Sequence, residues 1–254
     1  MEPPPVLTSV RGDVGTLTLN RPDAMNAFSV ELATALEAGL AELATRARVI
    51  LIRGAGGHFC VGGDFHEVQR LRAEGSEALA GLFAAFGRAT ALIARLPVPV
   101  ISVVQGFAMA GGFELMQASD IVLVADEAKI ADNHANHAMI PGGGGSQRLP
   151  RLVGRQRALA HLLTGERLRG PEAVAWGLAY RSLPAPELDA AAEALAERLA
   201  AKDPLSLARI KQLVDEGLAG SLADGLAHER ALVVTHIDGE AGGAGVAAFT
   251  SKGS

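Results

Sequence analysis

The residues with the clearest capacity for chemistry lie in one stretch, ADNHANHAMIPGGGGSQRL, residues 131–149. It holds His134 and His137, with Asp132 before them and four consecutive glycines, 142–145, after them. Such residues could form a metal centre, a phosphate cradle or an acid–base site in which imidazole moves a proton. No further ligand has zinc-like spacing, and the glycines lack the lysine and hydroxyl residue of a P-loop. The acid–base site is therefore favoured, no metal is expected, and His137 is the weaker catalytic candidate.

Two glycine-bearing loops share one design. GHFCVGGDF, residues 57–65, follows the apolar run VILI, and QGFAMAGGFEL, residues 105–115, follows VPVISVV. Each pattern predicts a strand, a glycine turn and the start of a helix, where the first N–H groups lack an intrahelical acceptor and the dipole is positive. Because glycine lets a ligand approach closely, two such loops facing one point would stabilise a negatively charged oxygen. The alternative is that the glycines only make turns.

Glu114 lies three residues after Gly111, in the first turn of the second predicted helix. The helix dipole would also stabilise a surface glutamate there. The neighbouring residues in FELM are apolar, so we predict instead a buried carboxyl group that transfers a proton. The single cysteine, Cys60, has no obvious activating base and is predicted to be a buried, inert thiol.

Short apolar runs that alternate with helical patterns predict an α/β fold with parallel βαβ units to position these residues. Ser29 is a suitable N-cap for a helix whose leucines recur at helical spacing over 32–43. Almost everything after Arg148 is predicted to be helical. The glycine-rich end favours a mobile segment, with Val246 and Phe249 available for docking. Other expected elements are strands in 6–19, 49–52, 98–104 and 120–126, and helices in 76–95, 111–119, 186–201 and 204–218.

The composition disfavours several classes of protein. The 254 residues are 49% apolar and 20% charged, which is ordinary for a soluble globular chain that buries a core. A net charge of −5 favours neither nucleic acid nor an anionic membrane surface as a partner. No uninterrupted apolar run reaches about 18 residues, so no membrane span is expected. One cysteine and a start, MEPPPVLTSV, unlike a signal peptide predict a cytoplasmic location.

A series of segments in order resembles the crotonase family (enoyl-CoA hydratase/isomerase): NRPDAMNAF, GHFCVGGDF, QGFAMAGGFEL, IPGGGGSQRLPRLVG, LLTGERL and EAVAWGLA. The resemblance runs from about residue 6 to 252, nearly the whole chain. It implies a crotonase-like spiral of ββα units with an acyl-CoA site over 1–195, and a C-terminal helical trimerisation region over 196–254. It further implies an acyl-CoA thioester substrate, no cofactor beyond the coenzyme A of that substrate, and a homotrimer or a dimer of trimers (homohexamer).

The resemblance also implies roles for single residues. The N–H groups of Gly63 and Gly111 would bind the enolate oxygen of the thioester, and Glu114 matches the family's first catalytic glutamate. Lys252 resembles a C-terminal lysine near the CoA phosphates, whereas Asp23 stands where some members have a basic residue. The substrate-binding residues implied are Ala24, Met25, Ala27, Val61, Asp64, Phe65 and His66.

The chain departs from the family's pattern at the second glutamate with which hydratases hold a water. That position falls on His134, and no carboxylate lies between Asp132 and Pro141. A neutral imidazole, with an ordinary pKa of ~6.5, can still accept a proton, so we predict that His134 is catalytic. A core histidine or a lost catalytic residue are the alternatives. Asp132 is two residues away, which on a strand or loop could place it on another face.

The expected reaction is therefore hydration, or isomerisation, of a 2-enoyl-CoA through a thioester enolate. The missing glutamate leaves open a crotonase-fold hydrolase that uses His134 to cleave a thioester or, in a retro-Claisen reaction, a C–C bond. A non-catalytic acyl-CoA-binding protein is the alternative from another class.

Overall fold

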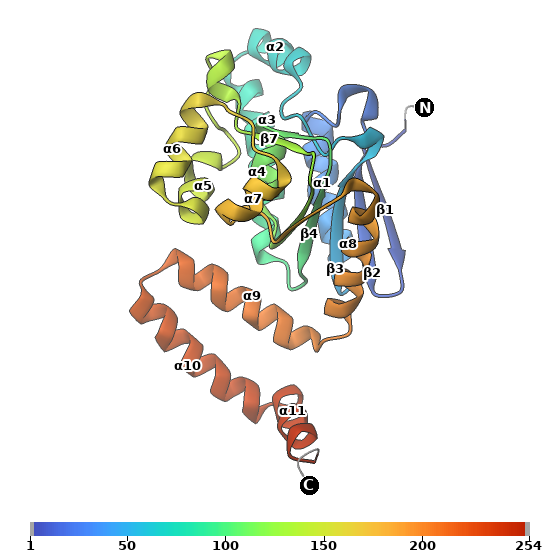
Figure 1. Ribbon diagram of the computed structural model, residues 1–254, viewed down its shortest axis with the longest axis vertical. Coiled ribbons are helices and arrows are strands. Elements are labelled where there is room, and N and C mark those ends of the chain that lie inside the picture. Colours follow the sequence, from blue (N-terminus) through green and yellow to red (C-terminus); the bar gives the residue numbers. More distant parts are fainter. Residues whose placement is uncertain (1–2, 252–254) are drawn as a thin grey trace.

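The computed structural model describes residues 3–251 and consists of an α/β body from which the last helices project (Figure 1). The body contains a six-stranded sheet of order β1-β2-β3-β4-β6-β8, in which only the β1–β2 pair is antiparallel. Strands β5 and β7 form a separate parallel pair. The strands are β1 (Val6–Arg11), β2 (Val14–Leu19), β3 (Val49–Gly54), β4 (Val100–Val104), β5 (Phe107–Met109), β6 (Ile121–Ala125), β7 (Lys129–Ala131) and β8 (Arg181–Leu183).

Helices cover both faces of the central strands. The run Val49–Ile52 in β3 is buried at every position, which requires cover on both sides of the sheet, as in other parallel sheets. Ser29 Oγ accepts a hydrogen bond from Leu32 N at 3.0 Å, so the predicted cap of α1 is confirmed. The helices are α1 (Val30–Ala44), α2 (Phe65–Glu74), α3 (Ser76–Arg95), α4 (Gly111–Ala118), α5 (Gly145–Val153), α6 (Arg155–Thr164), α7 (Gly170–Trp176), α8 (Ala185–Ala200), α9 (Pro204–Ala219), α10 (Leu222–Asp238) and α11 (Glu240–Ser251).

Two parts of the chain differ from the sequence-based expectation. Residues 181–183, in a region predicted to be helical, form β8 and pair in parallel with β6. The end predicted to be mobile forms α11, which packs against α10.

The C-terminal helices α9, α10 and α11 form an arm that extends from the body (Figure 1). The predicted domain boundary at residue 195 lies inside α8, and this helix remains packed on the body through Ala196 and Ala200. The arm begins at Asp203, the N-cap of α9. Several apolar side chains of the arm are exposed: Leu205, Ile210, Val214, Leu218, Leu222, Leu226, Val233, Val234, Ile237, Val246 and Phe249.

Lys211 of α9 fastens the arm to the body. Its Nζ donates to Ile93 O at 2.6 Å, to Val98 O at 3.2 Å and to Asp120 Oδ2 at 2.7 Å. Ile93 lies in the last turn of α3, whose orphan carbonyls need donors. One cation therefore joins α9 to α3 and to the loop before β6.

Helix α3 is long and apolar, and it packs on the body of the protein. By length and composition alone it could cross a membrane, although the sequence has no uninterrupted apolar run of that length. It packs against α1, α2 and α4 and buries a face that includes Leu82, Phe86 and Ile93. Core helices of soluble proteins share these properties, so the resemblance to a membrane span is weak.

Candidate active site

The two glycine loops lie directly against each other. Met109 N donates to Cys60 O at 2.9 Å, which links the loop after β4 to the loop after β3. A Cβ atom at Gly112 would lie 2.1 Å from Cys60 O, and one at Gly62 would lie 2.7 Å from the Cβ of Ala110. Only residues without a side chain allow this approach.

Gly63 and Gly111 line one cavity, and neither N–H has a hydrogen-bond acceptor within residues 3–251. Gly111 is the first residue of α4, so its N–H lies at the positive end of the helix. Ala110 precedes it with φ 47° and ψ −117°, a conformation that residues with side chains rarely adopt. The hydrogen bond from Ala110 N to Ala131 O, 2.9 Å, helps to hold this strained turn.

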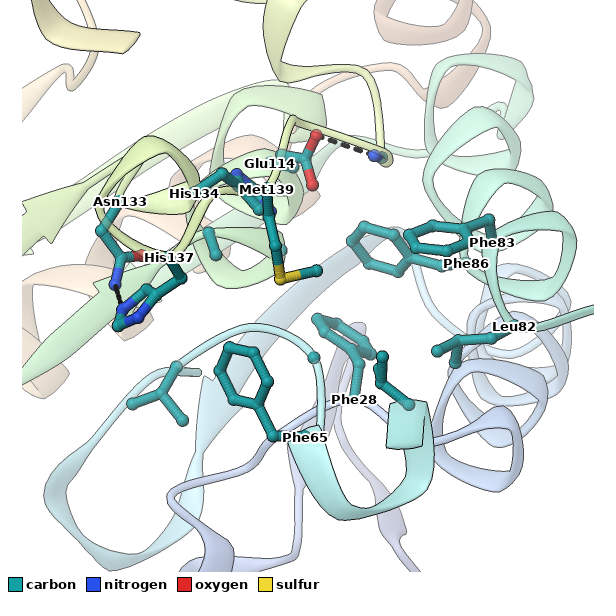
Figure 2. A pocket seen from close by; sticks show the side chains of 16 residues that line it. Phe28, Phe65, Leu82, Phe83, Phe86, Glu114, Asn133, His134, His137 and Met139 are labelled. Atoms are coloured by element: carbon teal, nitrogen blue, oxygen red, sulfur yellow. Dashed lines mark hydrogen bonds between the residues drawn. The ribbon is translucent and has the colours of Figure 1, made fainter. Parts of the chain in front are cut away.

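Glu114 of α4 is buried beside these loops, with 2% of its surface exposed. Its Oε1 accepts hydrogen bonds from Gly143 N at 2.7 Å and from Gly145 N at 2.8 Å. The glycine run 142–145 thus supplies donors to a carboxyl group of the chain itself. The other carboxyl oxygen of Glu114 points into the cavity (Figure 2). Burial raises the pKa of Glu114, against the lowering effects of the two N–H donors and of His134.

His134 lines the same cavity, and its orientation is set by Asp132. Its Nδ1 lies 2.7 Å from Asp132 Oδ1, so Nδ1–H donates to the carboxylate and Nε2 is left for other contacts. His134 begins the short 3₁₀ helix η3 (His134–His137), which turns the chain back so that side chains two residues apart meet. Burial lowers the pKa of His134, but the hydrogen bond and charge of Asp132, with the charge of Glu114, raise it above its ordinary value.

The expectation that Asp132 could face away from the site is wrong. Asp132 is fully buried, and its backbone N–H donates to His161 Nε2 at 3.1 Å. A Cβ atom placed on Gly145 would lie 3.0 Å from Asp132 Oδ2 and 3.1 Å from Glu114 Oε1, so the two carboxyl groups are close neighbours. Oδ2 has no hydrogen-bond partner among the described residues. Glu114, Asp132 and His134 therefore form one buried cluster.

His137 lies at the edge of the cavity, apart from this cluster. Its ring contacts that of Phe65 edge to face, with centroids 5.7 Å apart, and its Nε2 lies 3.5 Å from Asn133 Nδ2. In the part of the chain that the structure describes, no group of three or more His, Cys, Asp or Glu side chains is placed to hold a metal ion.

The wall that faces the polar cluster is apolar (Figure 2). The cavity measures about 70 Å³. Among the apolar side chains of this wall, the sequence indicated Val61 and Phe65. It did not indicate the others, most of which come from the segment before α1, from α3 and from the loop after η3. Those side chains are Phe28, Leu82, Phe83, Phe86 and Met139, with Val68 from α2.

The family model for enoyl-CoA hydratase/isomerase matches residues 10–254. The chain belongs to this family. It is similar to the human mitochondrial enoyl-CoA hydratase domain-containing protein 2, with 35% identity over 244 residues that cover 93% of this chain and 82% of that protein.

Solved structures confirm the predicted crotonase-like fold. The enoyl-CoA hydratase of Polaromonas sp. JS666 superposes with a TM-score of 0.93 at 32% identity, covering 97% of each chain. That of Bacillus anthracis superposes with a TM-score of 0.91 at 30% identity, covering 98% of this chain and 96% of its own. These likenesses support acyl-CoA processing by an enzyme of the family.

The other residues that the family resemblance implied lie beside the cavity. Ala24, Met25 and Ala27 precede Phe28, and Val61 N donates to Met25 O at 3.2 Å, so this segment adjoins the first glycine loop. None of the three lines the cavity, and their contact with coenzyme A stays a prediction.

Asp64 has structural contacts at the same place. Its Oδ1 caps α2 by accepting from the N–H groups of His66 and Glu67, and its Oδ2 accepts from Arg21 at 2.9 Å. Burial raises its pKa, but the hydrogen bonds, above all that from Arg21, lower it below the ordinary value. Asp64 and His66 border a shallow polar hollow beside the cavity. Lys252 lies outside the described residues.

Cys60 lies in the first glycine loop and is fully buried, as predicted. Burial raises the pKa of its thiol to about 12. The thiol therefore stays protonated near neutral pH and is a poor nucleophile.

Proposed function

We propose that this protein hydrates a 2-enoyl-CoA through a thioester enolate. One observation carries the proposal: a single cavity presents two backbone N–H groups that have no acceptor among the described residues, a buried carboxyl group and an oriented imidazole. Family membership supports an acyl-CoA thioester as the substrate class. No cofactor beyond the coenzyme A of the substrate is needed for this reaction.

The N–H groups of Gly63 and Gly111 bind the thioester carbonyl oxygen in this proposal. Negative charge gathers on that oxygen as the enolate forms, and preorganised donors stabilise it without reorganising. Loss of one such donor costs about 10²–10³ in rate in other enzymes. The strained turn at Ala110 supports this role because it fixes the direction of the Gly111 N–H.

Glu114 and His134 divide the proton transfers. His134 Nε2 accepts a proton from water as the water oxygen bonds to the β-carbon. Glu114, protonated on the oxygen that points into the cavity, gives its proton to the α-carbon. The imidazolium then returns a proton to the Glu114 carboxylate, which restores both groups. Isomerisation would use Glu114 alone to move a proton between carbons.

The bond between His134 and Asp132 favours a second candidate, hydrolysis. An imidazole held by a buried carboxylate is a good base for water. Water activated by His134 Nε2 could attack the thioester carbonyl itself, with the same two N–H groups stabilising the tetrahedral oxyanion. The same base could serve a retro-Claisen cleavage of a C–C bond.

The test is to incubate the purified protein with crotonyl-CoA. Hydration removes the enoyl-thioester absorbance, releases no thiol and yields a 3-hydroxyacyl-CoA by mass spectrometry. Release of free coenzyme A thiol supports hydrolysis instead. Binding with neither change overturns catalysis of both kinds for this substrate and favours a non-catalytic acyl-CoA-binding protein.

We also propose a homotrimer or a dimer of trimers in the cytoplasm. The exposed apolar side chains of the arm support association between copies. The single buried thiol suits a reducing compartment. The net charge of −5 supports neither nucleic acid nor a membrane surface as a partner.

A further inference from the structure

The apolar wall of the cavity is rich in aromatic rings although the chain is poor in them. Aromatic residues make up 4% of the sequence, with eight phenylalanines in all. Four of the eight line this one cavity: Phe28, Phe65, Phe83 and Phe86. The core elsewhere consists mainly of Leu, Ile, Val and Ala. Composition therefore does not explain the rings at this wall.

The inner rings are held in place. Phe28 and Phe86 are buried, and their centroids lie 4.3 Å apart at an interplanar angle of 49°. A Cβ on Gly143 would lie 2.1 Å from Cε1 of Phe86, and one on Gly142 would lie 2.5 Å from Cε1 of Phe83. The glycine backbone thus holds Phe86 in place and contacts one edge of Phe83, whose remaining surface is partly exposed.

The outer rings of the wall are partly exposed to solvent. Phe65 is 58% exposed and Phe83 is 38% exposed, and both border the cavity. Met139 reaches toward the space between the rings (Figure 2), and a thioether makes favourable contacts with aromatic edges. Rings with free faces next to a flexible thioether suit a flat apolar ligand.

We propose that the acyl group carries an aromatic ring on its β-carbon, so that the substrate is a 3-arylpropenoyl-CoA. This inference rests on the proposed function. The polar cluster and the rings face each other across a small cavity, which puts the reacting carbons at Glu114 and His134 and a compact β-substituent among the rings (Figure 2). Each contact between a ring of the ligand and an aromatic side chain increases the affinity by a further factor of about two to ten. An alkyl group gains only the burial of its apolar surface.

The experiment compares a ring with a saturated group of the same size. Turnover is measured with 3-phenylpropenoyl-CoA, 3-cyclohexylpropenoyl-CoA, crotonyl-CoA and oct-2-enoyl-CoA. Binding is measured by calorimetry with the unreactive thioesters 3-phenylpropanoyl-CoA, 3-cyclohexylpropanoyl-CoA and hexanoyl-CoA. We expect about a tenfold preference for phenyl over cyclohexyl in both kcat/KM and Kd.

Variants test which side chains cause the preference for phenyl over cyclohexyl. Phe83→Leu and Phe65→Leu keep apolar bulk but remove a ring, and each is expected to reduce the phenyl-over-cyclohexyl ratio about threefold in both kcat/KM and Kd. Tyr180→Leu removes an exposed ring outside the cavity and leaves the ratio unchanged. A ratio unaffected by both phenylalanine variants overturns the proposed ring contacts.

Binding separates this inference from the proposed function. Phenyl-selective binding without turnover of any thioester supports the aromatic acyl group and overturns hydration. Turnover with cyclohexyl or linear groups bound as well as phenyl supports hydration and overturns the aromatic acyl group. If no CoA thioester binds, both proposals are overturned.

Discussion

Glu114 and His134 hold their protons more strongly than free glutamic acid and histidine do. Burial is the main cause for Glu114, and the buried partner Asp132 is the main raising influence for His134. In the proposed reaction His134 must start neutral and Glu114 must start protonated. We therefore expect a bell-shaped dependence of kcat/KM on pH, whose two limbs belong to Glu114 and His134 as a coupled pair.

The substitution Asp132→Asn tests whether His134 contributes to this pH profile. It removes the carboxylate that raises the pKa of His134, so the imidazole loses its proton at a lower pH. We expect the limb that depends on His134 to shift to lower pH and kcat to fall, because asparagine no longer selects one tautomer of His134. Rates are measured from about pH 5 to about pH 9, where most folded proteins are stable. The exposed Glu187→Gln variant is the control, and a pH profile unmoved in Asp132→Asn would show that His134 is not the base.

The substitution Glu114→Gln separates chemistry from stability. Glutamine keeps an oxygen for the N–H groups of Gly143 and Gly145 but cannot donate an acidic proton, so we expect turnover to fall by about 10²–10⁴. Because the folded pKa of Glu114 is raised, the native protein loses stability as pH rises through that pKa. The Tm of the variant relative to the native protein should therefore increase with pH. Equal turnover in both proteins would refute Glu114 as the acid.

At the scale of residues, the sequence predicted Glu114 and His134 as neighbours of the glycine loops but missed Asp132. The reason is local: η3 reverses the chain at His134, whereas an extended segment would separate residues two apart. The phenylalanines of the wall were missed for another reason. Phe83 and Phe86 follow the pattern of an ordinary helix face, and only the packing of α3 turns them toward the cavity.

At the scale of elements, two glycines in helices should respond in opposite ways to the same change. Gly112 in α4 has Cys60 O where a Cβ would lie, at 2.1 Å, whereas Gly87 in α3 has no atom within 4 Å of that position. We expect Gly87→Ala to stabilise the protein by about 0.5–1 kcal/mol through helix propensity. Gly112→Ala should destabilise it by about 1–3 kcal/mol, as overpacking does, and lower turnover by displacing the loops. Denaturant unfolding measures both, and equal effects would contradict the close contact of the loops.

The elements that the sequence did not predict are those without a local signal. The three residues of β8 are exposed or half-buried, so no apolar run marks them, and the strand depends on the edge that β6 offers. In α11 glycines disfavour a helix locally, and contacts with α9 and α10 decide the outcome. Longer elements such as α1 and β3 have a clear pattern of apolar residues in the sequence, and their bounds were predicted within a few residues.

At the scale of the molecule, the arm is the expected surface of association. Val214 and Leu218 of α9 are 55% and 72% exposed, and apolar side chains in such numbers favour burial against another copy. We expect sedimentation to give three or six times the 26.2 kDa of one chain. The double substitution Val214→Asp and Leu218→Asp should dissociate the assembly, while Leu163→Asp, an equally exposed site on α6, should not. A native protein that sediments as one chain would exclude the proposed trimer.

The attachment of the arm through Lys211 has a further consequence. Three oxygen atoms converge on this one ammonium group, two of them backbone carbonyls and the third a carboxylate oxygen of Asp120. Neutralising the side chain would weaken these contacts between α9 and the body. The direction in which each arm leaves its body would then vary from copy to copy. In the proposed assembly, the number of copies would therefore depend on the apolar surface, whereas their relative angles would depend on this single positive charge.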